Sequence, residues 1–186
     1  MLKGFSTKQL VFIALMSAFM FVINLIIGSG LIAITGIPLA NAIVTGIVFG
    51  TFIILMVRTL PKFGTFTLFL LVYSLLEIPT SLGGAPGFWP KVPINVITGL
   101  AGDIFLLLFN YKRWTHFIGF YILITINTLV FVYFLSLFGI PGVDKLISML
   151  WWILPLYWIL GTIGIFIGEF IYGRIKKNKT YLQIKD

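Results

Sequence analysis

Two pairs of polar side chains lie in or near the segment of an otherwise apolar sequence that is richest in proline and glycine. The two members of each pair are four residues apart. Tyr73 precedes Glu77, and Lys91 precedes Asn95. Residues four apart share one face of a helix, so each pair can point in a single direction. Lys91 and Asn95 belong to the segment "GGAPGFWPKVPIN" (residues 83–95), which three prolines stiffen. A phenol, a carboxylate, a cation and an amide that converge on one place can bind a small polar molecule.

The stiff segment also carries a tryptophan, Trp89. We predict that it holds Trp89 and Lys91 over the outer mouth of a ligand site, with Glu77 beneath them. The structural alternative is an ion pair between Glu77 and Lys91 at the membrane interface, with Trp89 as an aromatic anchor. Side chains of similar predicted depth on other helices are secondary candidates for the same pocket: Asn24, Asn41, Trp151, Trp152 and Tyr157. Asn127, near the middle of the fifth apolar stretch, is interpreted as structural.

Two further carboxylates, Asp103 and Glu169, lie in apolar stretches toward the opposite side from Glu77. Ionisable groups are costly in a bilayer and usually face the interior of the protein. Neutralisation by a neighbouring cation is one interpretation, and the available cations are Lys112, Arg113 and Arg174. The alternative is that these carboxylates contact a cytoplasmic partner.

The elements that must position these residues are membrane helices. The 186 residues are 60% hydrophobic and 10% charged, with a mean hydropathy of +1.12, whereas soluble domains are about 45–50% apolar and about 25% charged. A helix needs about 20 mainly apolar residues to span a bilayer. Six such stretches predict one all-α membrane domain over residues 1–186, a bundle of six transmembrane helices. The predicted helices are 9–27, 39–57, 64–82, 92–109, 116–138 and 146–172.

The basic residues orient this bundle in the lipid bilayer. Eleven of the 13 Lys and Arg residues fall on one side, and only Lys91 and Lys145 fall on the other. By the positive-inside rule both termini are cytoplasmic, in the cell membrane. The net charge of +8 then reflects topology, and we expect no nucleic-acid binding. The uncharged outward connection, residues 28–38, is either a lid over the site or the broken first part of the second helix.

The sequence lacks the residues that several kinds of catalysis require. The chain has no cysteine and one histidine, His116, which excludes a metal site built on those ligands. No Ser/His/Asp set can be assembled within the membrane, and no GxxxxGK[ST] loop is present to bind ATP. We therefore expect a protein that is not an enzyme and needs no cofactor. Transport is the favoured class, and active transport by so small a chain requires an energy-supplying partner or an oligomer.

Small residues recur at helical spacing in four of the predicted helices, where they allow close packing. The first helix contributes Ala14 and Ala18. The other three stripes are Ala42, Gly46 and Gly50; Gly99 and Gly102; and Gly161, Gly164 and Gly168. A bundle of this size uses most stripes internally, and one left over can dock another membrane protein. Periodicity does not decide which stripe that is.

Several segments resemble one class of membrane protein. The stretch "FSTKQLVFIALMSAFMFVIN" (residues 5–24) resembles the first helix of the substrate-binding S components of energy-coupling factor (ECF) vitamin importers, with Ala14 and Ala18 as its Ala-x-x-x-Ala motif. The "KFG" of residues 62–64 and the Gly-Leu-x-x-Asp of residues 99–103 are similar to elements of the Trep_Strep family of S components, whose substrate is unassigned.

This resemblance implies partners and a substrate site. Ala14 and Ala18 would dock the membrane-embedded T component, which couples to two cytoplasmic ATPase subunits. A small vitamin-like or heterocyclic micronutrient would bind near the outer face, under residues 28–38. Substrate-contacting residues vary among S components, so none is carried over by motif. A stand-alone secondary carrier and a non-transporting membrane scaffold are the alternatives.

Overall fold

The apolar stretches of the sequence fold as helices. The computed structural model describes residues 4–28, 30–31, 34, 39–82, 85–110, 115–139 and 143–177, with the side chains of residues 39–44 left aside. The regular elements are α1 (Thr7–Ile23), continued by the π-helical turn η1 (Asn24–Gly28), then α3 (Leu39–Thr59), α4 (Thr65–Glu77), α5 (Lys91–Leu108), α6 (Thr115–Leu137) and α7 (Val143–Ile175). No strand occurs in these ranges, and the predicted all-α class is confirmed.

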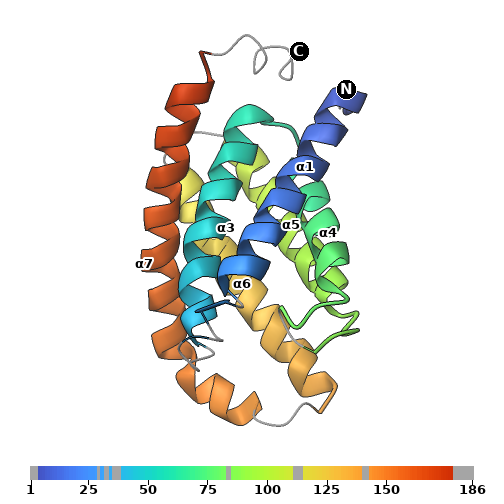
Figure 1. Cartoon of the computed structure of the whole chain (residues 1–186), viewed down its shortest axis with the longest axis vertical. Helices are drawn as coiled ribbons and strands as arrows, with labels where there is room; N and C mark the ends of the chain where they lie inside the picture. The colour runs from blue at the N-terminus through green and yellow to red at the C-terminus, as the bar shows by residue number, and fades with distance from the viewer. Residues whose placement is uncertain are drawn as a thin grey trace.

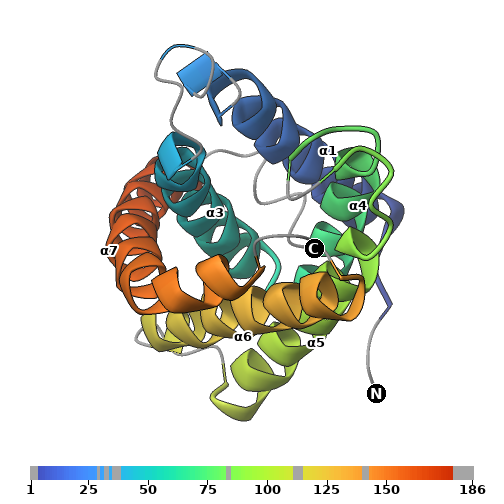
Figure 2. The same ribbon diagram turned by 90° about the horizontal axis from the view of Figure 1, so that it is seen from below.

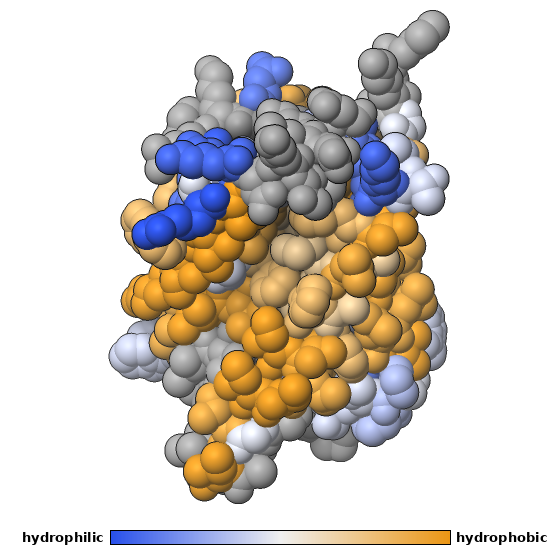
Figure 3. Space-filling model, turned by 45° about the horizontal axis from the view of Figure 1, so that its top comes forward, coloured by the Kyte–Doolittle hydropathy of each residue, from blue (hydrophilic) through white to orange (hydrophobic). Residues whose placement is uncertain are grey.

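In the part of the chain that the structure describes, four helical segments are long and apolar enough to cross a membrane. They are the joined α1 and η1, then α5, α6 and α7, whereas α4 and the fully described part of α3 are shorter apolar helices. Figure 3 shows hydrophilic residues at the end of the molecule where α1 begins, above predominantly hydrophobic sides. The structure thus supports a multi-pass membrane protein, and six crossings remain a prediction.

The helices form a ring when viewed along the bundle (Figure 2). Neighbours in the ring are α1 and α4, α4 and α5, α5 and α6, α6 and α7, and α7 and α3; η1 then closes the ring against α3. The start of α1 and the end of α7 lie at the same end of the molecule (Figure 1). The connection between α4 and α5 lies at the opposite end.

The predicted third helix is too long. It was expected to run to Leu82, but α4 ends at Glu77. Pro79 has no N–H with which to continue the helical hydrogen bonds. Thr80 instead donates its backbone N–H to the Glu77 carbonyl, at 2.9 Å, in a tighter turn. Glu77 therefore occupies the last position of the helix, and its side chain is buried.

Glycines decide how α3 and α7 meet. A side chain at Gly50 would collide with the carbonyl of Gly161, and one at Gly164 would collide with the carbonyl of Ile47. Thr51 uses this close approach to donate its hydroxyl across the interface to the Gly164 carbonyl, at 3.0 Å. The glycine stripes of these two helices are therefore internal packing faces.

Asp103 supplies the N-terminal cap of a helix other than its own. Its carboxylate is 1% exposed and accepts the backbone N–H groups of Phe66 and Thr67, at 3.1 and 2.9 Å, and the Thr67 hydroxyl, at 2.6 Å. The cap residue of α4 itself, Gly64, has no side chain to offer. Gly99 permits the approach, because a Cβ there would lie 2.6 Å from the Thr67 Cα. The predicted contact of Asp103 with a cytoplasmic partner is wrong, since the carboxylate is buried and used within the bundle.

Glu169 finds its cation on a neighbouring helix. Both Nε and Nη2 of Arg58 lie 2.8 Å from Glu169 Oε1. Arg58 is absent from the set predicted to neutralise this carboxylate, and Arg174 of that set lies over the Phe170 ring instead. Lys112 and Arg113 lie outside the described residues. The side-by-side packing of α3 and α7, which one sequence does not reveal, brings Arg58 and Glu169 together.

Candidate functional site

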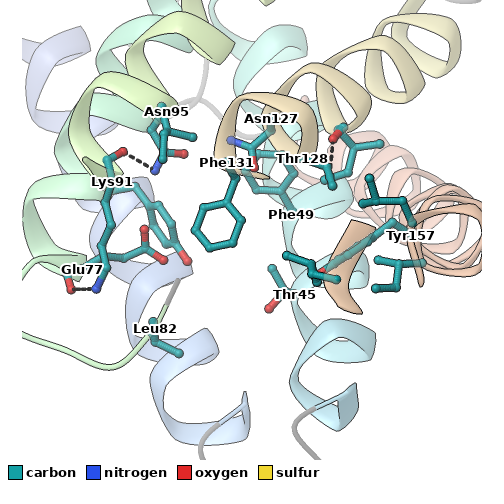
Figure 4. A pocket seen from close by; sticks show the side chains of 16 residues that line it. Thr45, Phe49, Glu77, Leu82, Lys91, Asn95, Asn127, Thr128, Phe131 and Tyr157 are labelled. Carbon is teal, nitrogen blue, oxygen red and sulfur yellow. Dashed lines mark hydrogen bonds between the residues drawn. The ribbon is translucent and has the colours of Figure 1, made fainter. Parts of the chain in front are cut away.

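A cavity of about 350 Å³ opens between the helices at the end of the bundle away from the start of α1 (Figure 4). This volume lies at the lower end of the range for sites that bind small molecules. Its walls come from five helices, α3 to α7, and from the connection that follows α4. The lining residues are Thr45, Phe49, Tyr73, Glu77, Leu82, Lys91, Ile94, Asn95, Ile124, Asn127, Thr128, Phe131, Leu146, Leu150, Ile153 and Tyr157.

Glu77 and Lys91 both line this cavity, but their charged groups do not pair with each other. The Lys91 ammonium donates to two backbone carbonyl oxygens, that of Glu77 at 3.0 Å and that of Thr80 at 2.7 Å. It thereby satisfies carbonyls left free at the C-terminal end of α4. Lys91 is 2% exposed and Glu77 is 6% exposed. The predicted alternative of an interfacial Glu77–Lys91 ion pair is wrong for these atoms, because the lysine holds the backbone.

Asn95 and Asn127 present their amide oxygens as spare acceptors. Asn95 Nδ2 donates to the Lys91 carbonyl, at 3.0 Å, one helical turn back. Asn127 Nδ2 donates to the Thr98 hydroxyl, also at 3.0 Å, and so ties α6 to α5. Both amides therefore position helices and line the cavity together (Figure 4). From the sequence, Asn127 is interpreted as structural only, and the structure adds that it lines the cavity. Its polar side chain at mid-membrane depth is the feature of the sequence that could have indicated this second role.

Tyr73 connects the cavity to the first helix. Its hydroxyl accepts a hydrogen bond from Asn24 Nδ2, at 2.9 Å, and is a hydrogen-bonding neighbour of the Glu77 carboxylate. Asn24 lies in η1, is buried, and stands behind Tyr73 rather than in the cavity wall. Among the described residues, its Oδ1 has no hydrogen-bond partner. The buried row Asn24–Tyr73–Glu77 thus fixes the orientation of the phenol beside the carboxylate.

Aromatic and aliphatic side chains close the other side of the cavity. Phe49 and Tyr157 lie across the space from Glu77, and Phe131 also lines the cavity (Figure 4). The first turns of α7 add aliphatic side chains and lie across the lower end of the bundle in Figure 1. Pro155, inside α7, cannot donate a helical hydrogen bond, and interior prolines bend helices. Sequence analysis missed Phe49 and Phe131, because nothing in an apolar run distinguishes a cavity wall from a lipid-facing side chain.

Two predicted aromatic residues lie away from the cavity. Trp89 is 59% exposed and packs edge-on against Phe138, with ring centroids 5.9 Å apart. Trp152 is 65% exposed and packs against Trp151, with centroids 4.3 Å apart. Neither lines the cavity, so the structure does not bring them together with Glu77. Exposed tryptophans of this kind are typical of the membrane interface.

Two other predicted features lie outside the residues that the structure describes. The side chain of Asn41 and most of residues 28–38 lie outside the described residues. Their assignment to the pocket and to a lid therefore stays a prediction.

The small-residue stripe of α1 faces away from the bundle. Ala14 is exposed and Ala18 is half-buried. Leu15 and Phe19, beside them, are also exposed. The opposite face of α1 packs inward, where Ser17 donates its hydroxyl to the Phe69 carbonyl of α4, at 2.9 Å. The stripe is therefore exposed at Ala14 and only partly covered at Ala18.

The chemistry of the cavity is that of hydrogen bonding and apolar contact. Within the described part of the chain, no group of three His, Cys, Asp or Glu side chains is placed to hold a metal ion. Glu77 is the one carboxylate among the lining residues.

Comparison with known proteins gives one match. The family model described as "hypothetical bacterial integral membrane protein (Trep_Strep)" matches residues 7–177. No curated protein and no solved structure matches the chain. The match spans every helix of the bundle and confirms the Trep_Strep resemblance of the sequence. The chain therefore belongs to the Trep_Strep family of hypothetical bacterial integral membrane proteins.

Proposed function

We propose that this protein is the substrate-binding S component of an ECF-type importer. It captures a small vitamin-like or heterocyclic molecule at the outer face of the cell membrane and acts by binding rather than by catalysis. A membrane-embedded T component and two cytoplasmic ATPase subunits supply the energy for uptake. The observation that carries the proposal is the cavity of about 350 Å³, which is lined by both polar and aromatic side chains.

The position of the cavity supports capture from outside the cell. Of the basic residues that the structure describes, most lie at the ends of helices on the side where α1 begins: Lys8, Arg58, Lys62, Arg174, Lys176 and Lys177. The positive-inside rule assigns this side to the cytoplasm. The cavity, at the far end of the bundle, then faces outward.

The outward face of α1 supports a membrane partner. The stripes of α3, α5 and α7 are used inside the bundle, because a side chain added at Gly50, Gly99 or Gly164 would meet backbone atoms of another helix. Ala14, by contrast, is exposed, and Ala18, one turn further along α1, is half-buried. Small residues let a second helix approach closely, so this face suits the T component.

Co-purification tests the proposal. The chain is co-expressed with a T component and an ATPase pair from the same source, and an affinity tag on this chain is used for capture. We expect the four subunits to purify together. The double substitution Ala14→Leu/Ala18→Leu should abolish capture, because two leucines hold the partner helix away. Ala101→Leu, on the partly exposed face of α5, is the matched control and should leave capture intact.

The other outcomes identify the alternatives. If wild type captures no partner, and uptake of a co-purifying small molecule persists without any ATPase, the protein is a stand-alone carrier. If it captures neither partner nor small molecule, a membrane scaffold is the better description.

A further inference from the structure

The geometry points to a ligand that carries a hydrogen-bond-donating cation, such as an ammonium or amidinium group, seated against the Glu77 carboxylate. This inference rests on the proposed function in one respect, namely that the cavity is a binding site. It adds the charge and the hydrogen-bonding character of the substrate. Three observations carry it: the spare hydrogen-bonding capacity of the cavity, the engagement of Lys91, and the aromatic wall.

Several oxygen atoms in the cavity wall can accept hydrogen bonds from a ligand. Asn95 and Asn127 each donate one amide N–H to a protein atom and keep their oxygens. The Thr128 hydroxyl donates to the Ile124 carbonyl, at 2.7 Å. Each amide therefore keeps its oxygen as an acceptor and one N–H as a donor, whereas the Thr128 oxygen can only accept. A ligand that brings donors can bind to these oxygens and to the Glu77 carboxylate.

The charges in the wall are not equivalent. The Lys91 ammonium donates two hydrogen bonds to the carbonyls that end α4 and is held there. The Glu77 carboxylate is buried, and among the described residues no cation forms an ion pair with it. A buried carboxylate without a paired cation is costly, and a cation that enters the cavity offsets that cost. A cationic group of a ligand would therefore lie beside Glu77.

The opposite wall suits the body of such a ligand. Phe49 and Tyr157 lie across the cavity from Glu77 and Lys91, and Phe131 also lines the space (Figure 4). Aromatic faces attract cations as well as flat apolar groups. A small molecule with a ring and a cationic donor therefore matches both sides of the space.

Three probes of similar size and different charge test this inference with the purified chain. Benzylammonium is the cation, benzyl alcohol the neutral analogue and benzoate the anion. Affinities are measured by isothermal titration calorimetry in detergent. We expect benzylammonium to bind at least about tenfold more tightly than benzyl alcohol, because hydrogen bonds to charged groups are the stronger ones. Benzoate should bind most weakly. Tighter binding of benzoate, equal binding of all three, or no measurable binding of benzylammonium overturns the inference.

Variants assign the preference to one carboxylate. Glu77→Gln keeps the shape of the side chain and removes its charge, so it should erase the advantage of benzylammonium and leave benzyl alcohol unchanged. Asp144→Asn removes an exposed negative charge from the start of α7 and is the matched control, which should keep the wild-type order. An unchanged order in Glu77→Gln overturns the assignment. If Glu77→Gln fails to fold, the order of the three probe affinities in the wild type still tests whether the site prefers a cationic ligand.

The two proposals fail separately. Subunit co-purification depends on the outer face of α1 and not on the cavity. Capture of the T component together with a preference for benzoate would retain the S component and reject the cationic ligand. Preferential binding of benzylammonium, together with no capture of a T component, would retain the cationic ligand and reject the S component.

Discussion

Lys91 Nζ lies 3.0 Å from the backbone carbonyl oxygen of Glu77, and this contact, rather than a charge pair between the two side chains, joins α4 to α5. The lysine is thereby a helix cap that reaches across a connection of 13 residues, from Ile78 to Pro90. The Glu77 carboxylate is left to face the cavity. The first four predictions below each test one such tertiary contact, and the fifth tests the orientation in the membrane.

Lys91→Met should destabilise the protein. Methionine fills similar space but donates no hydrogen bond, so the Thr80 carbonyl loses its Lys91 partner, whereas the Glu77 carbonyl keeps the two that Thr80 donates. Hydrogen bonds to a charged group contribute about 1.5–3 kcal/mol each, so a clearly lower unfolding temperature in detergent is expected. Lys145→Met, at an exposed site on α7, is the control and should unfold like wild type. Equal unfolding temperatures would show that the cap contributes nothing.

Asp103→Ala should loosen the start of α4. The carboxylate accepts two backbone N–H groups of that helix, and loss of an N-terminal cap costs about 0.5–2 kcal/mol. Asp103→Asn keeps an acceptor oxygen and should cost less than Asp103→Ala. Thermal unfolding gives the order, and hydrogen exchange at Phe66 and Thr67 localises the effect. If exchange there is unchanged in Asp103→Ala, the capping role is refuted.

Gly164→Ala should separate α3 from α7. Its new methyl group would collide with the Ile47 carbonyl, and forced overpacking costs about 1–3 kcal/mol. Gly173→Ala lies on the same helix, where nothing stands within 4 Å of the new atom. That control should be neutral or stabilise the helix by up to about 1 kcal/mol. Unchanged or higher stability in Gly164→Ala would show that the close contact between α3 and α7 tolerates a methyl group and would refute the prediction.

Arg58 and Glu169 should be energetically coupled. Both side chains are partly buried, and removing one partner leaves the other charged group without its 2.8 Å contact. In a double-mutant cycle of Arg58→Met and Glu169→Gln, the double variant should be more stable than the sum of the single losses predicts. We expect a coupling free energy of about 0.5–3 kcal/mol. Strictly additive losses would mean that the pair contributes no interaction of its own.

Cysteine accessibility labelling should establish the orientation of the protein in the membrane. Because the chain has no cysteine, each introduced thiol is the only one that can react. Ala85→Cys places a thiol in the exposed connection between α4 and α5, and Lys177→Cys places one just beyond α7. In intact cells a membrane-impermeant maleimide should label Ala85→Cys only. Lys177→Cys should react after the membrane is opened. The reverse pattern would place the termini outside and turn the cavity toward the cytoplasm.

The class of the protein and the place of its polar site were readable from the sequence. Long apolar runs can only satisfy their backbone groups as helices in a membrane, so composition decided the all-α class. Helical spacing put Tyr73 on the face of Glu77 and Lys91 on the face of Asn95, and all four residues line one cavity. These inferences succeed because they depend on contacts within one helix, which the spacing of residues determines.

What each polar group bonds to was decided only by the tertiary structure. Lys91 holds carbonyl oxygens, Asp103 caps α4, and Arg58 meets Glu169. Every one of these contacts joins two helices, and spacing along one helix carries no information about the neighbour or its depth. The same reason placed Asn127 in the cavity and Trp89 outside it. The spacing of residues along a helix shows which side chains share a face, whereas the packing of the bundle determines which residues of other helices they contact.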